Sequence, residues 1–206
     1  MSMKQLLLSL GFVVMFFECQ AFIATEKTDT SGRRILIIND FDPSNMKARD
    51  NKKELFAELA DSLKQYLAKE INGYSGFEAV VSEQLFPNIE GISLDSLLQK
   101  YDCTSAIKIN NLNVYFEQTD VEVTKISKGS KSRNASYDLC AVVQCHYYTI
   151  QKPIVPLEKR NCSFFTNRNV ASGLLAAGPD VVGKRKYTYN AIKENAVLLV
   201  SQLIYR

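Results

Sequence analysis

The chain has little of the chemistry that metal centres and common active sites need. It contains one histidine, His146, no tryptophan, and no pair of cysteines at C-x-x-C spacing. A histidine-rich metal site, and a zinc or dithiol site with that spacing, are therefore excluded. No phosphate loop of the form G-x-x-x-x-G-K-[ST] occurs, and no glycine fingerprint follows the first apolar run. We expect no metal and no cofactor.

The chain also lacks a large excess of either positive or negative charge. The formal net charge is +3, from 25 Lys and Arg against 22 Asp and Glu. An excess this small argues against a nucleic-acid partner. The length of 206 residues and a hydrophobic fraction of 46% are ordinary for a single globular domain with a proper core.

The amino-terminal segment has the pattern of an export signal. Lys4 precedes an apolar stretch of about 12 residues, too short for an ordinary membrane-spanning helix. We interpret residues 1–21 as a signal peptide, 22–33 as a flexible tether and 34–206 as a single domain. Two processing routes remain open, which are cleavage after Ala21 and lipidation of Cys19 as a membrane anchor.

Export sets the expected compartment. In a bacterium the protein would be periplasmic or associated with the outer membrane. In a eukaryote it would be a secreted binding protein, and the sequons at Asn134 and Asn161 could carry glycans. An oxidising compartment also favours disulfide bonds between the cysteines that follow the signal, which are Cys103, Cys140, Cys145 and Cys162.

Hydrophobic periodicity predicts an α/β (α+β) fold with a mixed sheet of about five strands and helices packed on it. The predicted order is β-α-β-α-β-β-β-α. The corresponding ranges are 34–41, 50–71, 77–82, 93–101, 106–125, 135–150, 159–166 and 187–206.

Residues 106–166 are predicted to form an antiparallel meander. The apolar phase changes at Asn110 and Asn111, which indicates a β-bulge or a kink. Pro153 and Pro156 indicate a turn. If that turn is centred near residues 153 and 154, Cys145 lies opposite Cys162, and this is the disulfide we favour. The alternative for Cys103 and Cys140 is a pair of buried free thiols.

Few side chains are candidates for chemistry. Asp40 and Asp42 follow the first strand, where α/β folds often place catalytic carboxylates, although capping and turn formation explain them better. Two basic clusters could meet an anionic envelope polymer, a lipid headgroup or an acidic protein. The first contains Lys125, Lys128, Lys131 and Arg133, and the second contains Lys184, Arg185 and Lys186.

This layout resembles a group of bacterial envelope proteins. The residues that carry the likeness are the strand Ile35–Phe41 after a polar tether, the long helix, the segment Leu97–Asp102, the meander, and the final helix Ala191–Ile204. The likeness is to the amino-terminal domain of the TolB translocation protein, the curli-secretion lipoprotein and the lipoprotein activators of penicillin-binding proteins. The cysteines and the loop Gly178-Pro179-Asp180 depart from that plan.

The resemblance implies a role in binding or assembly without enzymatic activity. We therefore expect an exported envelope protein that binds another protein or an envelope polymer. The alternative is a secreted hydrolase that uses Asp40 or Asp42.

Overall fold

The computed structural model describes residues 33–86, 92–127, 130–150, 152, 154–171 and 179–205. Residues 33–206 form one compact unit. The predicted signal peptide, with Cys19, lies outside the described residues, as do nearly all of the tether and Lys128.

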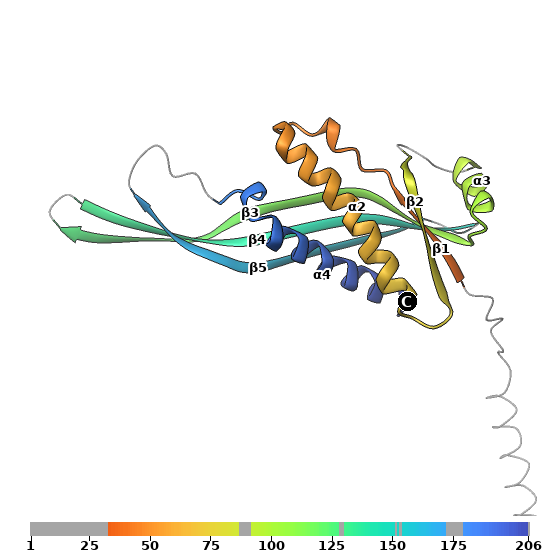
Figure 1. Cartoon of the computed structure of the whole chain (residues 1–206). Coiled ribbons are helices and arrows are strands. Elements are labelled where there is room, and N and C mark those ends of the chain that lie inside the picture. The colour runs from red at the N-terminus through yellow and green to blue at the C-terminus, as the bar shows by residue number, and fades with distance from the viewer. Residues whose placement is uncertain are drawn as a thin grey trace, which may run out of the picture. The chain divides into compact units, whose positions relative to one another are not determined.

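Strand β1 (Arg33–Asn39) lies between β2 (Phe77–Leu85) and β3 (Ser105–Ser127) and is parallel to both (Figure 1). Its residues Ile35 to Ile38 are at most 1% exposed. Both faces of β1 are thus covered, which explains why its sequence is a continuous apolar run instead of an alternation.

The second part of the sheet is an antiparallel meander of three strands. β3 pairs with β4 (Ser130–Thr149), and β4 pairs with β5 (Val155–Ala171). The sheet order is β2-β1-β3-β4-β5, so β5 is an edge strand. The register of β3 shifts between Ile109 and Asn111, which confirms the predicted irregularity.

β5 begins earlier in the chain than predicted, and this changes its register with β4. We expected the prolines to form the turn, but Pro156 lies within β5, opposite His146. An edge strand tolerates proline because the missing N–H has no neighbouring strand to bond. The turn therefore lies earlier in the chain, and Cys145 faces Leu157 instead of Cys162.

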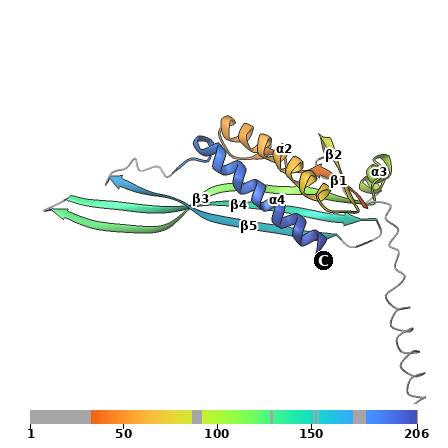
Figure 2. The same cartoon turned by 60° about the horizontal axis from the view of Figure 1, so that its bottom comes forward.

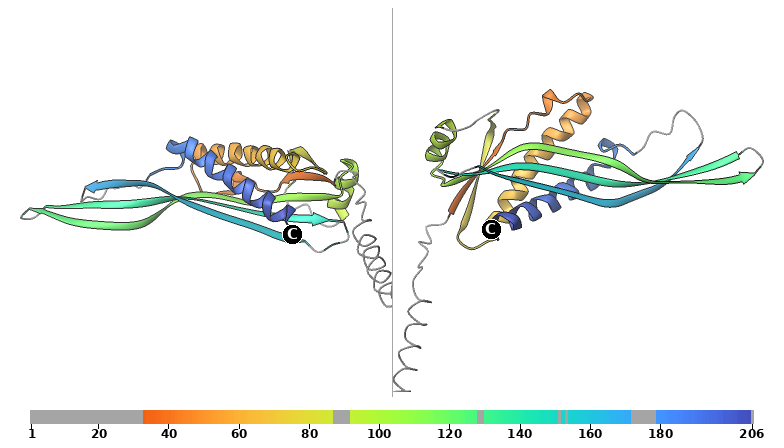
Figure 3. Two further views of the ribbon diagram at one scale, coloured as in Figure 1. Left: turned by 90° about the horizontal axis from the view of Figure 1, so that it is seen from below. Right: turned by 180° about the vertical axis from the view of Figure 1, so that it is seen from behind.

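Helices cover the two faces of the sheet unequally (Figures 2 and 3). α2 (Asp50–Asn72) and α4 (Arg185–Ile204) pack on one face of the sheet. The main core lies between these two helices and strands β1, β3, β4 and β5. α3 (Ile92–Lys100) packs on the other face against Leu36, Ile38 and Ala106. The predicted fold class is confirmed. Among the described residues, none of the helices combines the length and apolar character needed to cross a membrane.

Two short 3-10 helices precede the long helices. η1 (Pro43–Asn45) lies before α2, and η2 (Val182–Lys184) leads into α4. The turn between α2 and β2 contains Gly76 at φ 83°, a left-handed conformation that favours glycine.

One side of the meander carries no long helix in the described part of the chain. β3, β4 and β5 run on past α2 and α4 (Figure 1), and their side opposite those helices is here termed the open face. Alternate residues of the three strands lie on it. They include Tyr115 and Glu117 from β3, Cys140, Val142 and Gln144 from β4, and Glu158, Arg160, Cys162 and Phe164 from β5.

Candidate functional site

Both candidate carboxylates after β1 have structural contacts. Asp42 caps η1, because its side chain accepts a hydrogen bond from the Ser44 backbone N–H at 2.9 Å. Hydrogen bonds from Ser44 lower the pKa of Asp42. Asp40 forms an ion pair with Lys108, with 3.2 Å between Oδ2 and Nζ, and accepts a bond from the Asn110 amide. The capping and turn interpretation therefore fits Asp42, whereas Asp40 joins β1 to β3 through its contacts with Lys108 and Asn110.

Two cysteines are buried free thiols, Cys103 and Cys145. Burial raises the pKa of both, and that of Cys145 reaches about 12. The thiolate is the nucleophilic form, so neither residue is suited to nucleophilic chemistry. Since the folded-state pKa of Cys145 is raised, its contribution to stability is fully present below about pH 9 and is lost as the pH rises towards 12.

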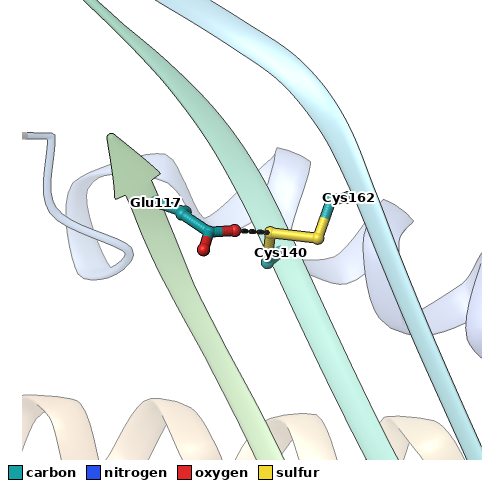
Figure 4. Close-up of side chains that lie close together, drawn as sticks. All are labelled: Glu117, Cys140 and Cys162. Carbon is teal, nitrogen blue, oxygen red and sulfur yellow. Dashed lines mark hydrogen bonds between the residues drawn. A yellow bond between two sulfur atoms is a disulfide. The ribbon is translucent and has the colours of Figure 1, made fainter. Parts of the chain in front are cut away.

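The disulfide joins Cys140 to Cys162, which corrects the predicted pair Cys145–Cys162. The two residues are directly opposed across β4 and β5, with 4.1 Å between their Cα atoms. Figure 4 shows the bond on the strands of the meander, with Glu117 of β3 beside Cys140. The buried thiol alternative, left open for Cys103 and Cys140, holds for Cys103 only.

A charged pair lies against this disulfide. The Arg160 guanidinium contacts the Glu117 carboxylate at 2.6 Å, and its Nε donates to Sγ of Cys162 at 3.3 Å. Its terminal nitrogen lies 4.0 Å from Sγ of Cys140. The Glu117 carboxylate lies 3.5 Å from the same sulfur, the contact that Figure 4 marks. A disulfide sulfur has no proton, so that contact becomes a hydrogen bond only in the reduced form.

Glu117, Cys140 and Cys162 could bind a metal ion only if the disulfide were reduced. One carboxylate oxygen of Glu117 and the sulfurs of Cys140 and Cys162 all lie within 4.8 Å of one another. Zinc binds cysteine as the thiolate, and a disulfide offers none. With the bond formed and the Arg160 cation in contact, the cluster does not fit a metal ion.

An exposed aromatic ring extends this part of the open face. Phe164 is 69% exposed and follows Arg160 and Cys162 at spacings of two along β5. Residues two apart on a strand share a face, so the ring flanks the disulfide. Its neighbour Phe165 points to the helix side, where it packs on Phe116 and Tyr187.

A basic patch surrounds the start of α2. A hollow of about 330 Å³ is lined by Lys47, Arg49, Lys52, Asp180 and Val182, among others. η2 begins at this hollow, which brings the predicted cluster Lys184, Arg185 and Lys186 to the same side. The basic patch is defined here as Lys47, Arg49, Lys52, Lys184, Arg185 and Lys186.

Several cations of the basic patch are already engaged. Arg185 pairs with Glu58 at 3.0 Å. Lys52 lies over the Phe56 ring and Lys184 over the Phe165 ring. In the part of the chain that the structure describes, Lys47, Arg49 and Lys186 are exposed and have no ion-pair partner.

The other predicted basic cluster lies at the end of the β3–β4 hairpin. The register pairs Lys125 with Lys131, and Val123 with Arg133. The side chains of Lys125, Lys131 and Arg133 lie outside the described residues. β3 and β4 run to this end past the helices, on the side where α2 begins (Figures 1 and 2).

Sequence patterns did not predict a role for Arg160, Glu117, Phe164 or Lys108. The signal for Arg160 was available, since a residue two positions before a cysteine on a strand shares its face. Lys108 stands out as the charged residue in the run Ala106–Ile109, but its partner is visible only once β1 and β3 are known to pair with Ile38 beside Lys108.

Comparison with known proteins gives structural neighbours only. No protein-family model matches the chain. No curated protein matches it. Among solved structures, a minor lipoprotein from Acinetobacter baumannii aligns over 82% of this chain and 89% of its own, with 9% identity and a TM-score of 0.35.

Two further neighbours are similarly distant. A putative neuraminyllactose-binding hemagglutinin homolog from Helicobacter pylori aligns over 84% of this chain and 86% of its own, with 14% identity and a TM-score of 0.44. Rare lipoprotein B from Shewanella oneidensis aligns over 84% of this chain and 91% of its own, with 7% identity and a TM-score of 0.29. Because these TM-scores lie below 0.5, the likenesses carry no argument about a ligand or partner. The resemblance to TolB and the two lipoprotein groups stays a prediction.

Proposed function

We propose that the chain is an exported, non-enzymatic binding protein of the bacterial cell envelope that meets an anionic partner at the basic patch. The observation that carries the proposal is the set of three exposed cations, Lys47, Arg49 and Lys186, without an ion-pair partner among the described residues. Two of them line the hollow at the start of α2.

The electrostatics of α2 add to those cations. α2 has 23 residues, and its N-cap residue Arg49 makes no side-chain hydrogen bond to the first turn. The positive end of the helix dipole therefore lies at the hollow without a side-chain cap. The acidic residues nearby, Asp50 and Asp180, reduce this potential without matching the number of cations. A partner with several negative charges fits this surface better than a neutral one.

Charge reversal of the three cations tests the proposal. The variant K47E/R49E/K186E is expected to lower capture of the partner at least tenfold in cross-linking and pull-down from intact cells. Capture by the natural chain is expected to fall as salt is raised from about 50 to 500 mM, because exposed charges are screened. The matched control K69E/K100E/K193E makes the same charge change at exposed lysines elsewhere and should leave capture unchanged.

Two outcomes contradict the proposal. One is a natural chain that stays a clean monomer with no cross-linked partner. The other is equal capture by the reversed variant and the control. Thermal unfolding of both variants separates a lost contact from a lost fold. Vesicles with anionic and with zwitterionic headgroups then distinguish a lipid from a polymer or an acidic protein.

We also propose that the amino-terminal segment exports the chain to the envelope, where the mature form is either anchored by lipid or free. Cys19 offers a lipid anchor, and cleavage after Ala21 offers a free periplasmic form. The mass of the mature amino terminus is expected to match one of these two species. A chain that retains Met1 to Ala21 unmodified would contradict export and place the protein in another compartment.

A further inference from the structure

We propose that the Cys140–Cys162 disulfide is a thiol–disulfide exchange site, attacked at Cys162 by an external thiolate with Arg160 as a positioning residue. This activity is independent of the basic patch. It rests on three observations, which are the unequal exposure of the two cysteines, the charged pair against their sulfurs, and the exposed ring beside them.

Exposure decides which sulfur is attacked. Cys162 is exposed on edge strand β5, whereas Cys140 is 0% exposed. Exchange needs a thiolate to reach one sulfur along the S–S axis, so access selects Sγ of Cys162. The buried Cys140 sulfur is then the leaving group.

The charges beside the disulfide act in opposite directions. Nε of Arg160 donates to Sγ of Cys162 at 3.3 Å, so the cation attracts an incoming thiolate and stabilises negative charge that spreads over the sulfurs. The Glu117 carboxylate lies 3.5 Å from the leaving sulfur and holds Arg160 in an ion pair at 2.6 Å. Glu117 therefore opposes the departure of Cys140 as a thiolate.

The reaction balances without any group beyond a thiol. An external thiolate R–S⁻ forms a bond to Sγ of Cys162, the bond between the two protein sulfurs breaks, and its electron pair leaves on Sγ of Cys140. A second thiolate then attacks the R sulfur, which releases R–S–S–R′ and leaves Cys162 as a thiolate. The protein disulfide is reduced, two external thiols are oxidised, and two protons pass from those thiols to the protein thiolates or to solvent.

The surroundings favour a peptide thiol over a small one. Arg160, Cys162 and Phe164 lie on one face of β5, and among the described strands β5 pairs with β4 alone. An extended peptide can lie along such an edge and place an aromatic or apolar neighbour of its cysteine on the Phe164 ring. Glutathione supplies the same thiolate without that neighbour.

The test measures the rate of exchange of the folded full chain with glutathione and with a cysteine peptide that carries an adjacent phenylalanine. Arg160→Gln is expected to slow both reactions about fivefold, the effect of one charge at about 4 Å in a solvated site. Glu117→Gln is expected to accelerate both by a similar factor. Phe164→Ala should slow the peptide reaction and leave the glutathione reaction unchanged.

Trapping experiments identify the sulfur that is attacked. After a brief reaction and alkylation, mass spectrometry should find glutathione on Cys162 and the alkyl group on Cys140. The buried thiols Cys103 and Cys145 serve as internal controls and should stay unlabelled while the chain is folded.

Three results would overturn the proposal, each of them decisive alone. They are a glutathione adduct on Cys140, rates for both charge variants within a factor of two of the natural chain, and reduction that occurs only after unfolding in urea. Because the two charge variants are expected to change the rate in opposite directions, a general loss of structure cannot reproduce the expected pair of results.

Discussion

Replacing Lys108 with methionine is expected to lower the free energy of unfolding by about 3 kcal/mol. The side chains of Lys108 and Asp40 are 5% and 12% exposed, and their charged atoms lie 3.2 Å apart. Methionine keeps much of the apolar stem of lysine, so the loss comes mainly from the ion pair that the largely buried Asp40 carboxylate no longer makes. Urea unfolding followed by circular dichroism measures the change.

A double-mutant cycle separates the ion pair from the packing around it. The pair D40N/K108M removes both charges and should recover most of the stability that K108M loses, since a neutral pair leaves no unmatched buried charge. A loss below about 1 kcal/mol in K108M would mean that the pair behaves as a surface ion pair.

The same cycle bears on the hydrolase alternative. Replacing a catalytic carboxylate often stabilises a protein, because active sites hold strained or repelling groups. Asp40→Asn is instead expected to destabilise the chain, because Lys108 would lose its ion-pair partner Asp40. A more stable D40N variant would contradict the structural role that the contacts of Asp40 indicate.

Those parts of the fold that depend on local patterns could be predicted from the sequence. The apolar run before Asp40 predicted β1, observed at Arg33–Asn39, and the three-four periodicity predicted α2, observed at Asp50–Asn72. Both signals are local, since burial on two faces requires a continuous apolar run and burial on one helix face requires apolar residues every third or fourth position.

The register of β5 could not be predicted in the same way. A proline pair usually indicates a turn, and only the position of β5 at the edge of the sheet makes Pro156 acceptable within a strand. Edge position is a property of the whole sheet. Because the cysteine pairing follows from the register, the error about Pro156 became the error about Cys145.

The two ion pairs Lys108–Asp40 and Arg160–Glu117 also depend on which strands pair and in which register. Lys108 meets Asp40 because β1 and β3 are parallel neighbours, and Arg160 meets Glu117 across two strand pairings. Ion-pair partners that are brought together by strand pairing cannot be recognised from the local sequence. The basic cluster Lys184, Arg185 and Lys186 was visible as a run, but its neighbours Lys47 and Arg49 are more than a hundred residues away in the sequence.

Removal of the disulfide in the variant C140A/C162S is expected to lower the free energy of unfolding by about 3 kcal/mol. The two cysteines are separated by 22 residues, and closing a loop of that size removes conformational freedom mainly from the unfolded chain. Alanine suits the buried Cys140, and serine suits the exposed Cys162. Urea unfolding of the oxidised natural chain and of the variant measures the difference.

Reductant and single replacements show which pair carries that stability. A reducing agent should lower the stability of the natural chain towards that of C140A/C162S and leave the variant unaffected. Cys145→Ala should keep the response to reductant, whereas Cys140→Ala should abolish it, because Cys145 faces Leu157 in the observed register. The opposite pattern would mean that Cys145 is the partner of Cys162. β5 would then have to shift by five residues along β4. That shift would move Leu157 away from the position where it is buried in the core.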